Sequence, residues 1–279
     1  MLLSVVIITY NEEANIGRTL ASVQPLVADG KGEIIVVDSG STDRTIEIAK
    51  LYGAKVFVEE WKGYAQQKNS AIDKAAGDWI LSLDADEEVD SELNEELTPH
   101  RGDNLPRASG EWRFTTEQSR NPECLNGAPV AFLVRRKNYF LGRWIKRGGF
   151  WPDSKLRLFR RAEGRFEDRA VHEDVRVNGP RKLIARGALI HHSYPTLSDY
   201  IEHMNRYSSL GAEMVVAKGK VRFSFSNIVL RPLFTFIYNY LFRLGFLDGR
   251  EGLLLHLYHA VYVSWKYAKA WELSRKKPD

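Results

Sequence analysis

The run Asp78-Trp-Ile-Leu-Ser-Leu-Asp84-Ala85-Asp86 decides how this chain folds. Residues 79–83 are mostly apolar and predict a buried strand, and two carboxylates one residue apart follow at its end. Mg²⁺ and Mn²⁺ prefer oxygen ligands, and Mg²⁺ takes one or two protein carboxylates together with substrate phosphates. Aspartates in turns also bond their own backbone. The surrounding sequence must therefore decide between a metal site and an ordinary turn.

Strands and helices alternate over the first hundred residues. We predict strands at 3–9, 33–37, 55–58 and 79–83, and helices at 15–23, 42–52 and 64–76, the second helix capped by Ser41 or Thr42. This alternation predicts parallel βαβ units with ligands at the carboxyl ends of the strands. The sequence has neither a GxGxxG turn after the first strand nor a Walker A lysine motif, so a nucleotide must be held in another way.

Short polar segments follow three of these strands. They are Thr-Tyr-Asn-Glu-Glu at 9–13, Asp-Ser-Gly-Ser-Thr-Asp at 38–43, and the aspartate pair. Each alone is explained by a cap or a turn, but together they lie at one end of one sheet. We therefore predict a site for a diphosphate nucleotide, in which Asp38 and Glu12 accept hydrogen bonds from the base or ribose and a cation neutralises the phosphates.

Length and composition fit one large domain with an appendage. The chain has 279 residues, and its 44% hydrophobic and 27% charged content is ordinary for a soluble globular protein. We predict a catalytic domain at 1–217, with a nucleotide half at about 1–100 and an acceptor half at about 101–217, and an extension at 218–279. The single cysteine, Cys124, excludes an internal disulfide and fits a reducing cytoplasm. The first residues lack the features of a signal peptide and predict a strand.

The extension carries most of the positive charge. From Lys218 onward there are 11 Lys and Arg against 4 Asp and Glu, whereas the first 217 residues have 29 against 32. Of the 32 aromatic residues, 12 lie between Phe223 and Tyr267, and the extension has no uninterrupted apolar stretch long enough to span a bilayer. We predict amphipathic helices that lie on an anionic membrane surface. The alternative is a helical subdomain or a homo-oligomer interface.

The motifs also carry a resemblance to a known family. Residues 5–12 (Val-Val-Ile-Ile-Thr-Tyr-Asn-Glu), 35–43 (Ile-Val-Val-Asp-Ser-Gly-Ser-Thr-Asp) and 83–87 (Leu-Asp-Ala-Asp-Glu) resemble the family 2 glycosyltransferases. That resemblance implies a GT-A fold, a Rossmann-like mixed, mostly parallel sheet flanked by helices, here with a C-terminal helical extension. It also implies a nucleotide-sugar donor and inversion at the anomeric carbon.

Further segments are similar to a narrower group. They are Gln66-Gln-Lys-Asn69, Val171-His-Glu173, His191-His-Ser-Tyr194 and Gly245-Phe-Leu-Asp-Gly249, and they resemble the bacterial lipopolysaccharide inner-core β-glycosyltransferases. The enzyme that adds β-1,4-glucose to heptose is typical of that group. Members use several sugars and acceptors, so the resemblance is firmer for the reaction than for the substrate.

The resemblance implies roles for individual residues. Asp38 and Glu12 would contact the uracil and ribose of a UDP-sugar. Thr9 and Tyr10 would line the pocket of the base. Asp86 would bind Mg²⁺ or Mn²⁺, and Asp84 would touch the ribose or a metal-bound water. The donor site would thus comprise Thr9, Tyr10, Glu12, Asp38, Gln67, Lys68, Asp84 and Ala85. For Lys68 the choice is between a charge offered to the donor and a solvated helix lysine.

His191 is a second candidate metal ligand. It follows an apolar stretch, 182–190, that predicts a strand, and several GT-A enzymes place a histidine from this region on the metal. A neutral imidazole is a softer ligand than a carboxylate and would favour Mn²⁺ over Mg²⁺. A hydrogen-bonded core histidine is the alternative.

An inverting transfer needs a base that takes the proton of the attacking hydroxyl. The segment 166–174 holds four carboxylates, of which Glu173 follows the histidine of the resembling motif. We predict Glu173 as the base and Asp174 as the second candidate, with Asp168 also open. The cation acts on the departing diphosphate, and an inverting transfer requires no covalent nucleophile.

The segment 135–161 is rich in Arg, Trp and Gly. Arginine binds phosphate in a bidentate manner and tryptophan faces stack on sugars, so this segment predicts a site for a phosphorylated saccharide acceptor. A plain scaffold of three strands with a basic surface is the alternative.

The sequence thus predicts a metal-dependent inverting hexosyltransferase. It would move glucose from UDP-glucose to an inner-core heptose or a similar lipid-linked glycan, at the cytoplasmic face of a bacterial inner membrane. Two other classes are a GT-A nucleotidyltransferase and a non-catalytic polyanion-binding protein. The missing glycine-rich phosphate loop argues against the first, and the acidic first 217 residues argue against the second and against nucleic acid as a partner.

Overall fold

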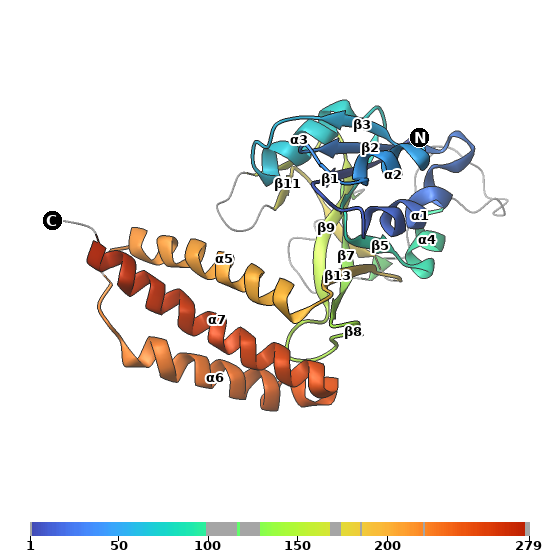
Figure 1. The fold of residues 1–279 in the computed structure, drawn as a ribbon. Helices are drawn as coiled ribbons and strands as arrows, with labels where there is room; N and C mark the ends of the chain where they lie inside the picture. The colour runs from blue at the N-terminus through green and yellow to red at the C-terminus, as the bar shows by residue number, and fades with distance from the viewer. Residues whose placement is uncertain are drawn as a thin grey trace. The chain divides into compact units, whose positions relative to one another are not determined.

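The four strands expected from the first hundred residues lie side by side in parallel. The computed structural model describes residues 2–98, 129–167, 174–184, 186–219 and 221–276, and the backbone of 116–117. The strands run in the order β3-β2-β1-β4 (Figure 1), with β1 at Leu3–Thr9, β2 at Gly32–Asp38, β3 at Lys55–Val58 and β4 at Trp79–Asp84. Their register places Thr9 beside Asp38 and Ile8 beside Asp84. The predicted polar segments therefore begin at one edge of the sheet.

Three helices connect these strands as predicted: α1 (Ile16–Val27), α2 (Thr45–Leu51) and α3 (Tyr64–Lys74). The short 3-10 turn η1 (Ala28–Gly30) and the helix α4 (Ser91–Leu97), which follows β4 in the chain, were not predicted. The predicted start of the second helix was wrong. It begins at Thr45, because the Asp43 carboxylate accepts hydrogen bonds from the Thr45 backbone N–H at 3.0 Å and hydroxyl at 2.6 Å, while Ser41 and Thr42 serve the turn before it.

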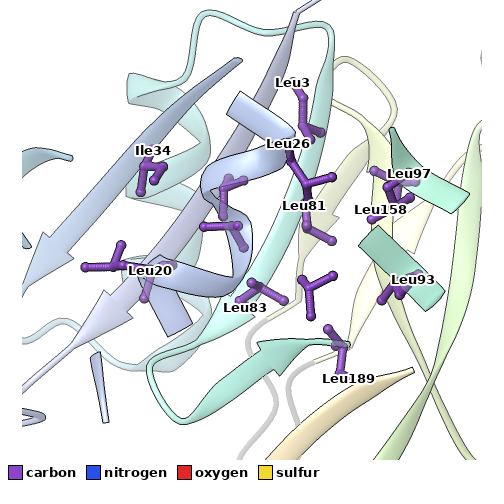
Figure 2. Close-up of a cluster of buried hydrophobic side chains, with 14 of the residues drawn as sticks. Leu3, Leu20, Leu26, Ile34, Leu81, Leu83, Leu93, Leu97, Leu158 and Leu189 are labelled. Atoms are coloured by element: carbon purple, nitrogen blue, oxygen red, sulfur yellow. The ribbon is translucent and has the colours of Figure 1, made fainter. Parts of the chain in front are cut away.

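The sheet is covered on both faces, which explains its continuous apolar strands. Val5 and Ile7 belong to the core cluster on one face. Figure 2 shows Leu20 of α1 and Leu93 of α4 in the same cluster. Val6 points to the other face, where it belongs to a cluster with residues of α3. Because strand side chains alternate between faces, one strand anchors both layers.

The remaining strands extend this sheet or form a small hairpin. They are β5 (Glu87–Val89), β6 (Thr116–Glu117), β7 (Ala131–Phe140), β8 (Arg143–Trp144), β9 (Asp153–Arg160), β10 (Gly164–Phe166), β11 (Val175–Val177), β12 (Arg181–Ile184) and β13 (Leu189–Tyr194). Strand β9 pairs antiparallel with β4, β12 pairs parallel with β7, and β10 pairs with β11 as a separate hairpin. The predicted single strand at 182–190 was wrong. It is two strands, β12 and β13, so His191 lies inside β13.

The chain divides into two compact units. The first comprises residues 1–136 and 154–191, and the second comprises residues 137–153 and 192–279. The predicted boundary after residue 217 falls inside the second unit, because α5 (Leu197–Ala217) packs along α7 (Gly249–Lys276). Of the helices that the structure describes, none combines the length and apolar composition that crossing a bilayer requires.

The second unit is built around α7. Figure 1 shows α7 between α5 and α6 (Arg231–Ile237). The π-helical segments η2 (Ser226–Leu230) and η3 (Tyr238–Phe242) flank α6, so that residues 225–242 form one continuous helix. The short 3-10 helix η4 (Gly245–Asp248) leads into α7.

Asp248 gives the Gly245–Gly249 motif a structural role in this unit. Its carboxylate accepts hydrogen bonds from the backbone N–H groups of Lys146 at 3.2 Å and Arg147 at 2.7 Å. The Gly245–Gly249 motif therefore holds the loop after β8 against the start of α7.

Candidate active site

The loops that follow β1 and β2 are joined by direct hydrogen bonds. The Asn11 N–H donates to the Ser41 hydroxyl and the Thr42 N–H donates to the Asn11 side-chain oxygen, both at 2.8 Å. The Glu12 N–H donates to the Thr45 hydroxyl at 2.8 Å. Asn11 adopts a positive φ of 53°, a conformation that asparagine tolerates better than most residues. The structure therefore brings together the two polar segments that the sequence assigned to the nucleotide.

Asp38 is fully buried and organises its own turn. Its Oδ1 accepts hydrogen bonds from the backbone of Gly40 at 2.9 Å and Ser41 at 2.7 Å, and its Oδ2 accepts from the Ser41 hydroxyl at 2.5 Å. A carboxylate has about four acceptor positions. One position on Oδ2 thus remains for the predicted contact with a base or ribose.

Two buried polar atoms at this edge have no hydrogen-bond partner among the described residues. They are Thr9 Oγ1 and Gln67 Oε1, on side chains that are at most 5% exposed. The other end of the Gln67 amide donates to the Ser39 hydroxyl at 3.3 Å. Tyr10, in contrast, is 56% exposed. Because buried polar groups are nearly always satisfied, a bound molecule or water is expected beside Thr9 and Gln67.

A buried charge network surrounds the first aspartate of the pair. Lys68 Nζ lies 2.8 Å from Asp84 Oδ1, and Arg157 lies 2.7 Å from Asp84 Oδ2. Arg157 also reaches the fully buried Glu87 at 2.6 Å, and Arg136 approaches the same carboxylate at 3.2 Å. Lys68 is 3% exposed, so the solvated alternative for this lysine was wrong. Asp84 is neutralised by the protein itself.

The same network sets the ionisation of the cluster. Burial alone would raise the pKa of Asp84, but the charges of Arg157 and Lys68 outweigh it and hold that pKa well below its usual value. Burial raises the pKa of Glu12, and the charges of Asp86, Asp43 and Asp84 raise it further, against the lowering effect of a hydrogen bond from Asn15. Glu12 therefore interacts electrostatically with the aspartate pair, as expected for residues of one site.

Asp86 faces a histidine. Its Oδ2 lies 3.2 Å from His191 Nε2, and no Lys or Arg pairs with it among the described residues. Antiparallel pairing of β5 with β13 sets His191 opposite Glu87, one residue beyond Asp86. The buried hydroxyl of Thr19, on α1, donates to the carbonyl of Ala85 at 2.6 Å and fixes the turn between the two aspartates. Burial raises the pKa of Asp86, but His191 outweighs it and the net shift is downward.

The pair formed by Asp86 and His191 fits a divalent cation. Two adjacent ligands of an octahedral ion, each about 2.1 Å from it, lie about 3 Å apart. The 3.2 Å between Asp86 and His191 is close to that separation. No group of three or more His, Cys, Asp or Glu within the described residues could hold a metal. Two protein ligands suit an ion whose remaining positions are filled by phosphates and water.

The candidate base Asp174 adjoins the hairpin β10–β11. Glu173 lies outside the described residues, whereas Asp174 immediately precedes β11, and its carbonyl accepts a hydrogen bond from the Glu167 N–H at 3.0 Å. Asn69 of α3 donates to the Phe166 carbonyl and accepts from the Phe166 N–H, both at 2.9 Å. Lys68 Nζ lies 5.1 Å from the centre of the Phe166 ring. The base of this hairpin therefore contacts the helix that carries Gln67 and Lys68.

Some residues of this site were missed or misread in the sequence. Arg157 was included in a phosphate-binding stretch, but it is 6% exposed and holds Asp84 and Glu87. Arg160 lies 5.2 Å from the Trp79 ring, and Arg161 donates to the Gly77 carbonyl at 3.0 Å. Arg136, in the same stretch, pairs with Glu87, and Thr19 was not predicted at all. The available signal was the position of Arg157 in an apolar run, Leu156 to Phe159, where a charge needs a buried partner.

Comparison with known proteins agrees with this geometry. Residues 4–162 match the model of the family "Glycosyl transferase family 2". The chain belongs to glycosyltransferase family 2. It is 31% identical to "Uncharacterized glycosyltransferase RT0209" of Rickettsia typhi, over 98% of this chain and 88% of that protein. It is 30% identical to "Lipopolysaccharide core biosynthesis glycosyltransferase LpsC" of Rhizobium meliloti, over 97% of this chain and 92% of that protein.

Membership in family 2 confirms three predictions: the family, the GT-A fold and the transferase activity. It decides against the nucleotidyltransferase and the non-catalytic binding protein. A solved structure with a matching segment is glucosyl-3-phosphoglycerate synthase of Mycobacterium tuberculosis with Mn²⁺, UDP and glucosyl-3-phosphoglycerate, at 33% identity. That match covers 30% of this chain and 33% of the other, with a TM-score of 0.28, and is too small to bear on fold or ligands.

The charge network predicts that replacing Arg157 destabilises the fold of this family 2 enzyme. Arg157→Met should lower the free energy of unfolding by about 3–5 kcal/mol, because it removes a cation that Glu87 and Asp84 share in the interior. The matched control is Arg165→Met, whose pair with Asp73 joins side chains that are 50% and 64% exposed, and it should cost less than about 1 kcal/mol. Urea unfolding measures both. Similar small losses for the two variants would contradict the assignment.

Proposed function

We propose that the protein is a metal-dependent inverting glycosyltransferase that moves a hexose, glucose from UDP-glucose, to a lipopolysaccharide inner-core heptose or a similar lipid-linked glycan. The observation that carries the proposal is the pair of Asp86 and His191, 3.2 Å apart at the carboxyl end of a parallel strand, beside an aspartate already neutralised by Lys68 and Arg157. Mg²⁺ or Mn²⁺ would be held by Asp86 and His191, and it would supply positive charge to the leaving diphosphate.

The donor is bound by the loops after β1 and β2 in this proposal. The unpartnered atoms Thr9 Oγ1 and Gln67 Oε1 are available to a nucleotide, and the exposed ring of Tyr10 is available to stack on its base. Asp38 offers its remaining acceptor position while holding the turn through Ser41. Ala85 presents no side-chain chemistry, and its role is to set the geometry of Asp84 and Asp86 through its bond from Thr19.

The acceptor class is supported by a relative and by a basic, aromatic surface of the second unit. The relative of Rhizobium meliloti is named for lipopolysaccharide core biosynthesis. In the second unit, Lys146 Nζ lies 4.4 Å and Lys137 Nζ lies 5.3 Å from the centre of the Trp144 ring, and Trp151 contacts that ring edge-on. Cations beside tryptophan suit a phosphorylated sugar. We place the reaction at the cytoplasmic face of the inner membrane, where a lipid-linked acceptor is presented.

Asp86→Asn should lower the transfer rate by at least about 10³-fold while the protein stays folded. The reason is that the cation contributes several kcal/mol of charge stabilisation and loses its carboxylate ligand. The assay is UDP release on addition of acceptor, with Mn²⁺ binding followed separately by calorimetry. Asp73→Asn, an exposed acid of α3, is the control. Unchanged Mn²⁺ affinity in Asp86→Asn, or full activity of the wild type in EDTA, would refute the metal site.

Glu173→Gln should lower the transfer rate by roughly 10²–10⁴-fold with little change in donor affinity, because a general base acts on the acceptor and not on the nucleotide. Glu163→Gln, at the turn before β10, is the control and should behave as wild type. Single-turnover transfer and UDP titration separate the two effects. A near-normal Glu173→Gln together with an inactive Asp174→Asn would assign the base to Asp174.

A further inference from the structure

The helix at 225–242 has an outer face that no described residue covers. Its inner side contacts α7, where the Ser264 hydroxyl donates to the Ile228 carbonyl at 2.8 Å and Arg231 donates to the Tyr267 hydroxyl. Pro232, on the same inner side, is buried. The helix therefore has a fixed orientation on α7.

The outer side of this helix is apolar along its whole length. The exposed large side chains occur singly or as adjacent pairs, three or four residues apart, and each is between 42% and 74% exposed: Phe225, Val229, Leu230, Leu233, Phe234, Tyr238, Leu241 and Phe242. Leu244, Phe246 and Leu247 continue the same character into η4 and are 41–51% exposed. Scattered surface apolar residues are normal, but a contiguous set of this size marks an interaction surface.

The charged residues in the sequence from Met214 to Leu247 are all positive. The sequence has no Asp or Glu between Met214 and Leu247, whereas it has Lys218, Lys220, Arg222, Arg231 and Arg243. Arg243 lies 5.7 Å from the centre of the Tyr238 ring, so a cation accompanies an exposed aromatic of the outer face. The occupant of the face must therefore offer apolar contact in the middle and negative charge at the margins.

This charge pattern discriminates between occupants. In a twofold dimer the same patch meets itself, so the cations of one copy would face those of the other without an acid of this segment between them. A lipid monolayer with anionic headgroups offers acyl chains to the apolar side chains and phosphates to the cations. Phe and Tyr also suit the boundary between headgroups and chains.

We propose that residues 225–247 lie flat in one leaflet of an anionic bilayer, with the outer face among the acyl chains and Arg243 at the lipid phosphates. Apolar insertion adds to the electrostatic attraction, so that high salt weakens the attachment but does not abolish it. The attachment needs no donor, metal or acceptor, and it is independent of the proposed transfer reaction.

The test uses the full-length protein and vesicles of phosphatidylglycerol with phosphatidylethanolamine, compared with phosphatidylcholine alone. Phe234→Asp and Phe242→Asp should each lower partitioning into anionic vesicles at least about tenfold, because each replaces an inserted aromatic with a charge. Leu51→Asp is the matched control, since Leu51 of α2 is 76% exposed in the first unit. It should bind as wild type does.

Two further measurements test the site without a variant and test for a dimer. Hydrogen exchange of the wild-type protein should show slower exchange in 225–247 on anionic vesicles, which tests the site even where a variant misfolds. Light scattering of the lipid-free protein gives the oligomeric state. Wild-type binding by both Asp variants, exchange unchanged by vesicles, or a dimer that Phe234→Asp dissociates would each overturn the proposal, the last in favour of an interface between copies.

Discussion

The guanidinium of Arg157 between Asp84 and Glu87 is the interaction on which the rest of the site depends. Glu87 is fully buried, and an ionised carboxylate in the interior is tolerated only with a cation close by. The other oxygen of Glu87 accepts a hydrogen bond from the Asp84 N–H at 3.1 Å, so this carboxylate folds the turn that carries both aspartates. Antiparallel pairing of β9 with β4 brings Arg157 to this place. Removing the cation would therefore disturb the turn as well as the charge.

The network also gives Asp84 and Asp86 different charge partners. Arg157 and Lys68 neutralise Asp84, and Arg157 and Arg136 neutralise Glu87, whereas Asp86 faces only the His191 ring among the described residues. With Glu12 nearby, the carboxylates of the cluster outnumber its Lys and Arg residues. A diphosphate entering this site would meet net negative charge unless a cation came with it. Electrostatics therefore favours the proposed metal at Asp86, which has no Lys or Arg partner within the described part of the chain.

Local patterns predicted the fold of the first hundred residues well. The strands β1 to β4 and their helices follow from apolar runs and turn residues, which are properties of adjacent residues. The partners of the site could not be found in this way. Thr19 lies 66 residues from Ala85, and Arg157 lies 73 residues from Asp84, so only the folded sheet brings them together. The helix start at Thr45 was missed because a distant partner helps to place Asp43. The Asp43 carboxylate accepts hydrogen bonds both from the Thr45 N–H and from the N–H of Glu13, in the loop after β1.

Three consecutive residues of α3 join the parts of the proposed reaction. Gln67 donates to Ser39 in the nucleotide turn at 3.3 Å, Lys68 pairs with Asp84 at 2.8 Å, and Asn69 holds Phe166 at the base of the hairpin that leads to Asp174. Successive helix residues point about 100° apart, so one turn reaches three separate segments. Because a helix is rigid, the spacing between donor site and hairpin is fixed before substrates bind. An in-line inversion depends on such spacing, since the base and the leaving group act on opposite sides of one carbon.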